Sequence, residues 1–168
     1  MSNAQTRART GAGVKFYISN APVNDADLDL EDFESGSITW VRINGVTEVG
    51  EGGVTTNSAT QSFLGEDVDD VSKVTDTPNT VPVTISKRFG DAGQTKLAEA
   101  SETRQNWLFK LDRDDSPDGV IPSSGEFMRG QVGGASKPRG DASAYHFEVY
   151  QIMQKQRPVE FDTSVSSA

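Results

Sequence analysis

The stretch of sequence that decides the fold is residues 80–111, TVPVTISKRFGDAGQTKLAEASETRQNWLFKL. Its first part alternates, with apolar side chains at positions 81, 83, 85 and 89 on one side of an extended chain. This period of two predicts a strand with one buried face, from Thr80 to Phe89. Pro82 lacks a backbone N–H group and therefore favours an edge strand or the start of a strand.

A helix is predicted directly after this strand. The side chain of Asp91 can accept a hydrogen bond from the first helical turn, and Gln94, three residues later, can complete a capping box. Leu97 and Ser101 then follow at helical spacing. We therefore expect one α-helix, at about Asp91–Arg104.

The chain returns to strands after the helix. Trp107, Phe109 and Leu111 alternate with the residues between them, which predicts a strand that ends before the turn sequence of residues 115–119. Farther along, Glu126–Val132 and Ala144–Met153 are joined by a glycine-rich linker. They are predicted to form a long hairpin.

On the N-terminal side, four shorter strands are predicted. Val14–Ile18 alternates, and Ser37–Ile43 is rich in β-branched and aromatic residues. Asn44-Gly45 favours a tight turn, so we expect a hairpin between that strand and Val46–Val49. Val54–Asn57 is a further candidate strand.

Two acidic regions interrupt this pattern and are predicted to be loops. The first runs from Asn24 to Glu34 and contains six acidic residues without one basic residue. The second, Glu66–Asp76, lies within a longer segment, Gln61–Thr80, that carries several apolar side chains in an acidic, turn-rich frame.

The predicted fold is mainly β. Many strands with a single helix are typical of an antiparallel two-sheet sandwich or a partly open barrel, with long loops and the helix covering one end or edge. The expected organisation is a flexible N-terminal arm over residues 1–13, a single β domain over residues 14–153, and a C-terminal arm over residues 154–168. The N-terminal stretch has no apolar core, so neither a secretory signal nor a transmembrane span is expected there.

The charge balance argues against a nucleic acid as a bound partner. The chain has 25 acidic and 16 basic residues and a net charge of -9, which repels polyanions. It contains no cysteine, so its stability cannot depend on disulfides or an oxidising compartment. No stretch is long and apolar enough to suggest a membrane partner.

No arrangement of residues indicates catalysis or metal binding. The acidic run that starts at Asp25 resembles the start of a calcium loop but has Leu30 where the sharp turn requires glycine, and the run that starts at Asp112 has Pro117 there. His146 is the only histidine, and no nucleophile–base pair or phosphate-binding glycine motif is visible. We therefore expect no enzyme activity, no cofactor and no metal.

The aromatic residues of the predicted strands are expected to belong to the core. Trp40, Trp107 and Phe109 lie at alternating strand positions, which is more typical of residues that hold sheets together than of an exposed ligand platform. A ligand-binding or carbohydrate-binding β-sandwich remains an alternative, and it would require Trp40 or Trp107 to be exposed.

The decisive stretch resembles a known family. Asp91-Ala92-Gly93-Gln94, the helix that it starts and the strand Trp107–Leu111 are similar to the major tail tube protein family of siphophages, the phages with long non-contractile tails. That family is related in fold to the type VI secretion tube protein, which is the nearest alternative. The resemblance covers roughly Ser37–Met153.

The resemblance implies a structural virion protein. Members of the family form hexameric rings that stack into the tail tube, a conduit for genome delivery. It implies as partners other copies of the chain, the tape measure protein, the tail tip and the tail terminator protein, in the virion tail and, during assembly, in the host cytoplasm. DNA is expected to pass through the lumen without specific binding, and we hypothesise that part of the negative charge lines the channel.

The apolar residues of the second acidic region form a candidate contact between adjacent rings. A solvated loop needs no such side chains, so we hypothesise that the segment becomes ordered against a neighbouring ring. The alternative is that it packs on its own subunit. The candidate residues are Phe63, Leu64, Val68, Val71 and Val74.

Overall fold

The computed structural model describes residues 13–23, 26–114, 123–137 and 146–161. Within these residues the chain is mainly β, with few helices. The elements are β1 (Lys15–Ser19), α1 (Leu30–Glu34), β2 (Trp40–Ile43), β3 (Val46–Val49), β4 (Val54–Gln61), β5 (Asp70–Pro78), β6 (Thr80–Ser86), α2 (Ala92–Ser101), β7 (Trp107–Asp112), β8 (Gly125–Val132), β9 (Phe147–Gln154) and β10 (Val159–Phe161).

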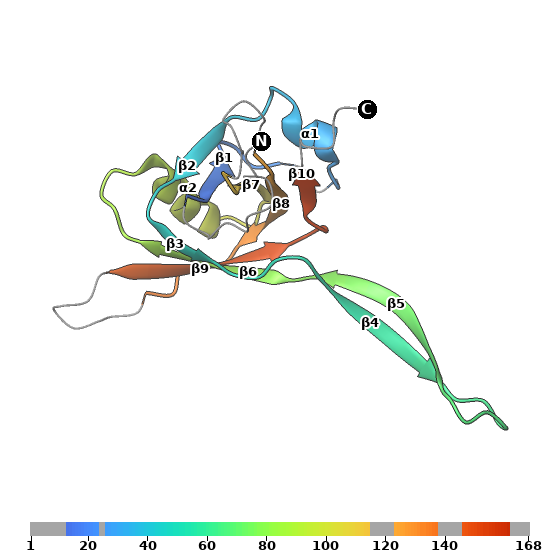
Figure 1. Cartoon of the computed structure of the whole chain (residues 1–168). Coiled ribbons are helices and arrows are strands. Elements are labelled where there is room, and N and C mark those ends of the chain that lie inside the picture. The colour runs from blue at the N-terminus through green and yellow to red at the C-terminus, as the bar shows by residue number, and fades with distance from the viewer. Residues whose placement is uncertain (1–12, 24–25, 115–122, 138–145, 162–168) are drawn as a thin grey trace, which may run out of the picture.

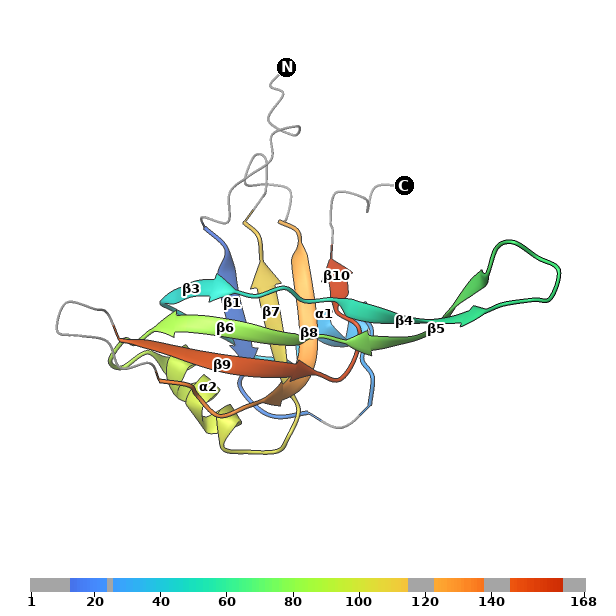
Figure 2. The ribbon, with the colours of Figure 1, turned by 90° about the horizontal axis from the view of Figure 1, so that it is seen from below.

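Eight of the strands form one antiparallel sheet. Its order is β2-β1-β7-β8-β9-β6-β3, with β10 paired to β8 beside this path. The sheet is strongly curled, and Figure 2 shows β6 and β9 running across β1, β7 and β8. Strands β4 and β5 form a second, two-stranded sheet. The prediction of a mainly β, partly open barrel is confirmed.

The predicted hairpin across Asn44-Gly45 is wrong, although the turn is present. Gly45 has a φ of +80°, and a Cβ atom there would lie 2.7 Å from the carbonyl oxygen of Ser86. The strands on either side of the turn do not pair with each other: β2 pairs with β1, and β3 pairs with β6. The turn therefore carries the chain from one end of the sheet to the other, which brings the two ends together.

The larger core lies inside the curled sheet and is closed at one end by α2 (Figure 1). Leu97 and Ala100 of α2 are fully buried in it. Gly93 allows the helix to lie directly on β2, because a Cβ atom at Gly93 would overlap with the backbone oxygen of Arg42. The predicted core residues Trp107 and Phe109 are buried there.

A second, smaller core lies on the opposite face of β7 and β8. Leu108 and Phe127 of these strands pack with Phe33 of α1 and Phe161 of β10, and Trp40 packs against them partly buried. Phe33 and Phe127 are stacked, with ring centroids 4.9 Å apart. Because cores lie on both of its faces, β7 begins with three consecutive buried residues instead of an alternating pattern.

The first acidic region is not entirely a loop, because α1 occupies residues 30–34. Asp29 caps this helix, and its carboxylate and that of Asp32 form a reciprocal capping box. Carboxylates in the first turn also interact favourably with the positive end of the helix dipole. Phe33 then anchors the turn in the second core.

Other predicted boundaries also differ. The strand expected to reach Phe89 ends at Ser86, and the Phe89 side chain is fully exposed. Helix α2 ends at Ser101, three residues before the expected end. The segment expected to be a C-terminal arm, residues 154–168, includes β10, which pairs with β8.

The second acidic region is also not a loop, since most of it is β5. Val49 of β3 lies opposite Val83 of β6, and Val54 of β4 lies opposite Pro78 of β5. Both strands of the hairpin advance by five residues between these two pairs, so the pairing register is the same in both sheets. Gly50 and Pro82 are hydrogen-bonded across the gap between the two ladders. The four strands therefore make one long hairpin, and its outer half, β4–β5, projects from the body (Figures 1 and 2).

A substitution at Gly93 tests the close contact between α2 and β2. Gly93→Ala is expected to lower the free energy of unfolding by about 1–3 kcal/mol, as other overpacked core substitutions do. The better helix propensity of alanine acts in the opposite direction but is smaller. Urea denaturation measures the difference. Gly36→Ala is the matched control, because nothing lies within 4 Å of its Cβ position; equal stability of the two variants would contradict the packing argument.

Candidate functional site

The projecting hairpin β4–β5, which we call the ribbon, is the part of the chain least explained by its own fold. Every residue from Thr55 to Thr75 is exposed, on both faces of the two strands. A two-stranded hairpin without a buried face is marginally stable in water. The ribbon is therefore suited to contact with something outside its own subunit.

Polar side chains hold the ribbon in an extended shape. Thr56 donates a hydrogen bond to the carboxylate of Asp76 on the opposite strand, and the amide of Asn57 donates to the hydroxyl groups of Thr75 and Thr77. Threonine is β-branched and favours strand geometry. These features replace, within the ribbon, the apolar packing that supports the other strands.

Asp76 connects the base of the ribbon to the body. Its carboxylate forms ion pairs with Lys73 of the same strand and with Arg157, which lies between β9 and β10. The hydrogen bond from Lys73, followed by that from Thr56, lowers the pKa of Asp76 below its ordinary value. The contact with Arg157 ties the ribbon to a segment that follows it by 81 positions.

The five predicted contact residues all lie on the ribbon. At its tip, Ser62 donates a hydrogen bond to Asp69, and Gly65 has a φ of +88°. Val74 is the extra residue of a β-bulge, since Asn57 lies opposite Thr75 and Ser58 opposite Lys73. The exposed fractions are 45% for Phe63, 106% for Leu64, 77% for Val68, 61% for Val71 and 59% for Val74.

These exposed fractions distinguish the two alternatives for residues 61–80, which are contact with a neighbouring ring and packing on the same subunit. Packing on the same subunit would bury at least some of the five side chains, and all of them are exposed. Their exposure is compatible with a contact between copies, which stays a prediction. The sequence singled out these residues as an unusual apolar group, but it did not indicate that they share a hairpin.

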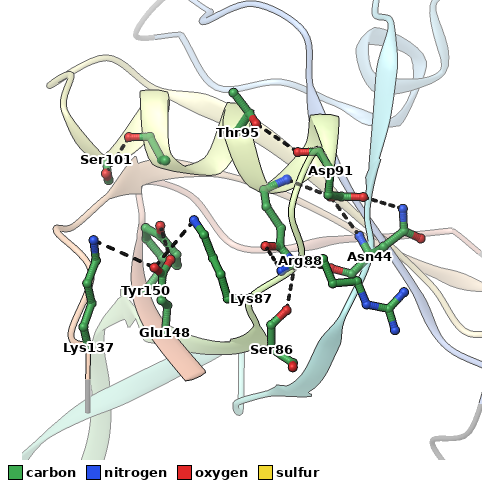
Figure 3. A network of polar contacts seen from close by, with 12 residues as sticks. Asn44, Ser86, Lys87, Arg88, Asp91, Thr95, Ser101, Lys137, Glu148 and Tyr150 are labelled. Carbon is green, nitrogen blue, oxygen red and sulfur yellow. Dashed lines mark hydrogen bonds and ion pairs between the residues drawn. The ribbon is translucent and has the colours of Figure 1, made fainter. Parts of the chain in front are cut away.

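The motif Asp91-Ala92-Gly93-Gln94 fixes the end of the body remote from the ribbon. Asp91 caps α2 and accepts a hydrogen bond of 2.6 Å from the side chain of Asn44 (Figure 3). Burial acts to raise the pKa of Asp91, but the hydrogen bonds from Asn44 and Gln94 and the nearby Arg88 outweigh it, so the pKa lies below its ordinary value.

Gln94 has a different role from the one predicted. It does not complete a capping box; its amide nitrogen donates to the carbonyl oxygens of Asn44 and Ser86, at 2.7 and 2.9 Å. Its amide oxygen accepts from the backbone N–H group of Arg88. One nearly buried side chain thus joins the turn after β2, the end of β6 and the start of α2.

A buried carboxylate lies beside this motif. Glu148 accepts a hydrogen bond of 2.9 Å from the hydroxyl group of Tyr150 and is paired with Lys87 and Lys137 (Figure 3). Burial, together with Glu148, raises the pKa of Tyr150 well above its ordinary value. Both lysines are partly or largely exposed, so their positive charges remain at the surface.

The acidic residues considered as metal ligands have structural roles where they are described. Asp27 pairs with the buried Arg129, at 2.7 Å, and Asp29 caps α1. Asp112 accepts hydrogen bonds from Asp114 and Ser123. Asp25, Ser116 and Pro117 lie outside the described residues. Over the described ranges, no group of three acidic, histidine or cysteine residues is arranged to hold a metal ion.

The remaining candidates from the sequence are His146 and the two tryptophans. His146 is exposed next to the start of β9, and its carbonyl oxygen accepts a hydrogen bond from Lys87. Trp107 is buried, while Trp40 is half-buried beside a groove of about 510 Å³ lined by aromatic residues and Lys110. A ligand-binding module could use that groove. Among the described helices, none has the length and apolar character to span a membrane.

A substitution at Asp91 tests the cap and its charge. Asp91→Ala is expected to lower the free energy of unfolding by about 1–2 kcal/mol at pH 7, because α2 loses its N-cap. The folded-state pKa lies below the ordinary value of 3.8, so this stabilisation is present above about pH 4 and is lost as the pH falls through the folded-state pKa.

Urea denaturation of the wild type and the variant at pH 7 and pH 3 measures the effect. The difference in stability is expected to shrink at pH 3. Asp67→Ala, at an exposed tip position, is the control and should leave the stability at pH 7 unchanged. A difference that stays constant between the two pH values would show that the charge of Asp91 does not contribute.

Comparison with known proteins gives no match at the level of sequence. No family model and no curated protein matches the chain. Solved structures do match, and they include a sheath/tube terminator of the PVC extracellular contractile injection system, at 6% identity and a TM-score of 0.61. The alignment covers 94% of this chain and 99% of that chain.

Two further structures have similar scores. A chain of the anti-feeding prophage baseplate matches at 10% identity and a TM-score of 0.59, over 98% of this chain and 100% of that chain. The SPP1 tail tube matches at 14% identity and a TM-score of 0.57, over 94% of this chain and 83% of that chain. The chain therefore has the fold found in these tube, terminator and baseplate structures.

Proposed function

We propose that this chain is a structural subunit of the tail tube of a long-tailed phage, and that it assembles with copies of itself into stacked hexameric rings. The observation that carries the proposal is the ribbon, whose two faces and five apolar side chains are exposed in the described structure. The shared fold with the SPP1 tail tube supports it. The role requires no catalysis and no cofactor.

The edges of the large sheet fit the same proposal. Strands β2 and β3 end the path of the sheet, and each pairs along one edge only in the described structure. An unpaired strand edge is a liability in a monomer but can be covered in an assembly. Contacts between different surfaces of identical subunits generate closed rings when the rotation closes.

The proposed subunit belongs to the tail of the virion and is made in the host cytoplasm. Its partners are its own copies and, at the ends and inside the tube, the tail tip, terminator and tape measure proteins. The lumen passes DNA without specific binding, and the net charge of -9 supports this, because an acidic wall does not retain a polyanion.

Negative-stain electron microscopy of the concentrated wild-type protein tests assembly directly. Hollow rings and stacks of rings are the expected result, and persistent monomers at high concentration would contradict self-assembly without an initiator. The double variant Phe63→Ser/Leu64→Ser is expected to raise the concentration needed for stacking at least tenfold, because each buried apolar side chain contributes about 1.5–3 kcal/mol.

Ser72→Ala is the matched control for this variant, since Ser72 is an exposed ribbon residue without an apolar side chain. Circular dichroism should show unchanged folding in both variants, because the substituted residues lie outside the two cores. Unchanged stacking of the double variant would exclude the ribbon tip as the contact between rings.

Assembled particles are expected to retain no duplex DNA even at low salt, about 50 mM, where electrostatic binding is strongest. Co-sedimentation of labelled DNA with the particles measures retention. Salt-sensitive co-sedimentation would overturn the proposal of an acidic lumen.

A terminator or tube component of an injection system is the second candidate. The PVC sheath/tube terminator has the same fold and is covered over almost its whole length, which favours this candidate. A terminator closes the end of a tube, so single rings that do not stack at any concentration would support it. Stacked rings would support the tube subunit, of a phage or of a type VI-like system.

A further inference from the structure

We propose that the tip of the ribbon docks on the loop between β6 and α2 of a second copy of this chain. The acidic tip is defined by residues 62–70, and the basic loop by Lys87, Arg88 and Phe89. The inference rests on the proposed self-assembly and adds to it the surface that receives the ribbon.

The acidic tip combines negative charge with exposed apolar groups. Glu66, Asp67, Asp69 and Asp70 are all exposed, and no basic residue occurs between Gln61 and Ser72. Leu64 is fully exposed within this frame. A partner for the tip therefore needs positive charge around an apolar contact.

The basic loop has the complementary combination. Lys87 and Arg88 are exposed, and Phe89 between them and α2 is fully exposed. Lys137 lies beside Lys87, and both pair with Glu148 (Figure 3). The carboxylates beside these cations are inside the surface: Glu148 is buried and Asp91 is partly buried by its cap.

The two surfaces lie at opposite ends of one long hairpin. β5 leads from the acidic tip into β6, and β6 ends at Ser86, one residue before the basic loop. At about 3.3 Å per residue, the strand residues from Asp70 to Ser86 span roughly 55 Å. Figure 2 shows the ribbon projecting at one end of β6 and α2 lying toward the other.

Because of this separation the two surfaces cannot meet within one subunit. A contact between them joins two different surfaces of identical chains, so a pair of copies still has one free tip and one free loop. Such a head-to-tail contact extends without limit or closes after a full turn. The same long hairpin would thus set the distance from one subunit to the next.

Cysteine cross-linking tests the contact without requiring complete particles. The chain contains no cysteine, so the variants Leu64→Cys and Phe89→Cys each introduce a single thiol. With a short bismaleimide, an equal mixture of the two variants is expected to form covalent dimers at least tenfold faster than either variant alone. A chain that carries both substitutions is expected to give a ladder of covalent multimers.

Glu31→Cys is the control, because Glu31 is exposed on α1 and belongs to neither surface. Equal rates for Leu64→Cys with Phe89→Cys and for Leu64→Cys with Glu31→Cys would overturn the inference. Rings in the electron microscope together with such equal rates would leave the proposed function standing and remove this contact. Specific cross-linking without rings would support this contact and contradict the proposed assembly into rings.

A graded change of the tip charge separates this contact from a purely apolar one. In the Leu64→Cys background, Glu66→Gln/Asp67→Gln is expected to slow cross-linking to Phe89→Cys several-fold, and Glu66→Lys/Asp67→Lys about tenfold or more. The effect should decrease between low and physiological salt, where the Debye length falls to about 8 Å. Equal cross-linking rates for the unchanged tip, the Gln variant and the Lys variant would overturn the role of charge.

Discussion

The side chain of Gln94 makes the contact on which the body of the protein depends. The large sheet begins at β2 and ends at β3, and it becomes a curled, barrel-like structure only if these ends stay together. The amide of Gln94 donates to the carbonyl oxygen of Asn44, in the turn between β2 and β3, and to that of Ser86, at the end of β6. Asp91, in the same turn of α2, accepts a hydrogen bond from the side chain of Asn44. A buried amide with satisfied hydrogen bonds specifies one geometry, because any other would leave these groups unpaired. Gly93 completes the arrangement by letting α2 lie against the backbone of β2.

The fold class was predictable because most strands bury one face. β1, β6 and β7 were recognised from alternation, and α2 from its cap. The long hairpin expected from β8 and β9 is wrong, because only residues 130–132 pair with residues 152–154. The role of Gln94 was not predictable, because its partners are the backbone carbonyl groups of Asn44 and Ser86. The positions of these groups depend on the order of the strands in the sheet. The same dependence explains the error at Asn44-Gly45, since the sequence favours a turn there but does not state which strands pair across it.

The two acidic regions show a different reason for error. Both were expected to be loops because charge and turn residues outnumber apolar ones. In α1 a single phenylalanine, Phe33, and a reciprocal cap suffice for one helical turn. In β4–β5 the strands are threonine-rich and exposed on both faces, so the alternation that identifies a half-buried strand is absent. The candidate contact residues were nevertheless identified, because unexplained apolar side chains are visible in sequence without knowledge of the fold.

The order of the strands has a consequence for how the chain folds. β1 pairs with β7, which lies more than 80 residues later in the chain, and β8 pairs with β10, near residue 161. The ribbon, by contrast, pairs neighbouring segments, and local hairpins form within about 1–10 μs, far faster than sheets built from distant strands. The ribbon can therefore form while the body is still incomplete. The four carboxylates of its tip then make the tips of incomplete chains repel one another.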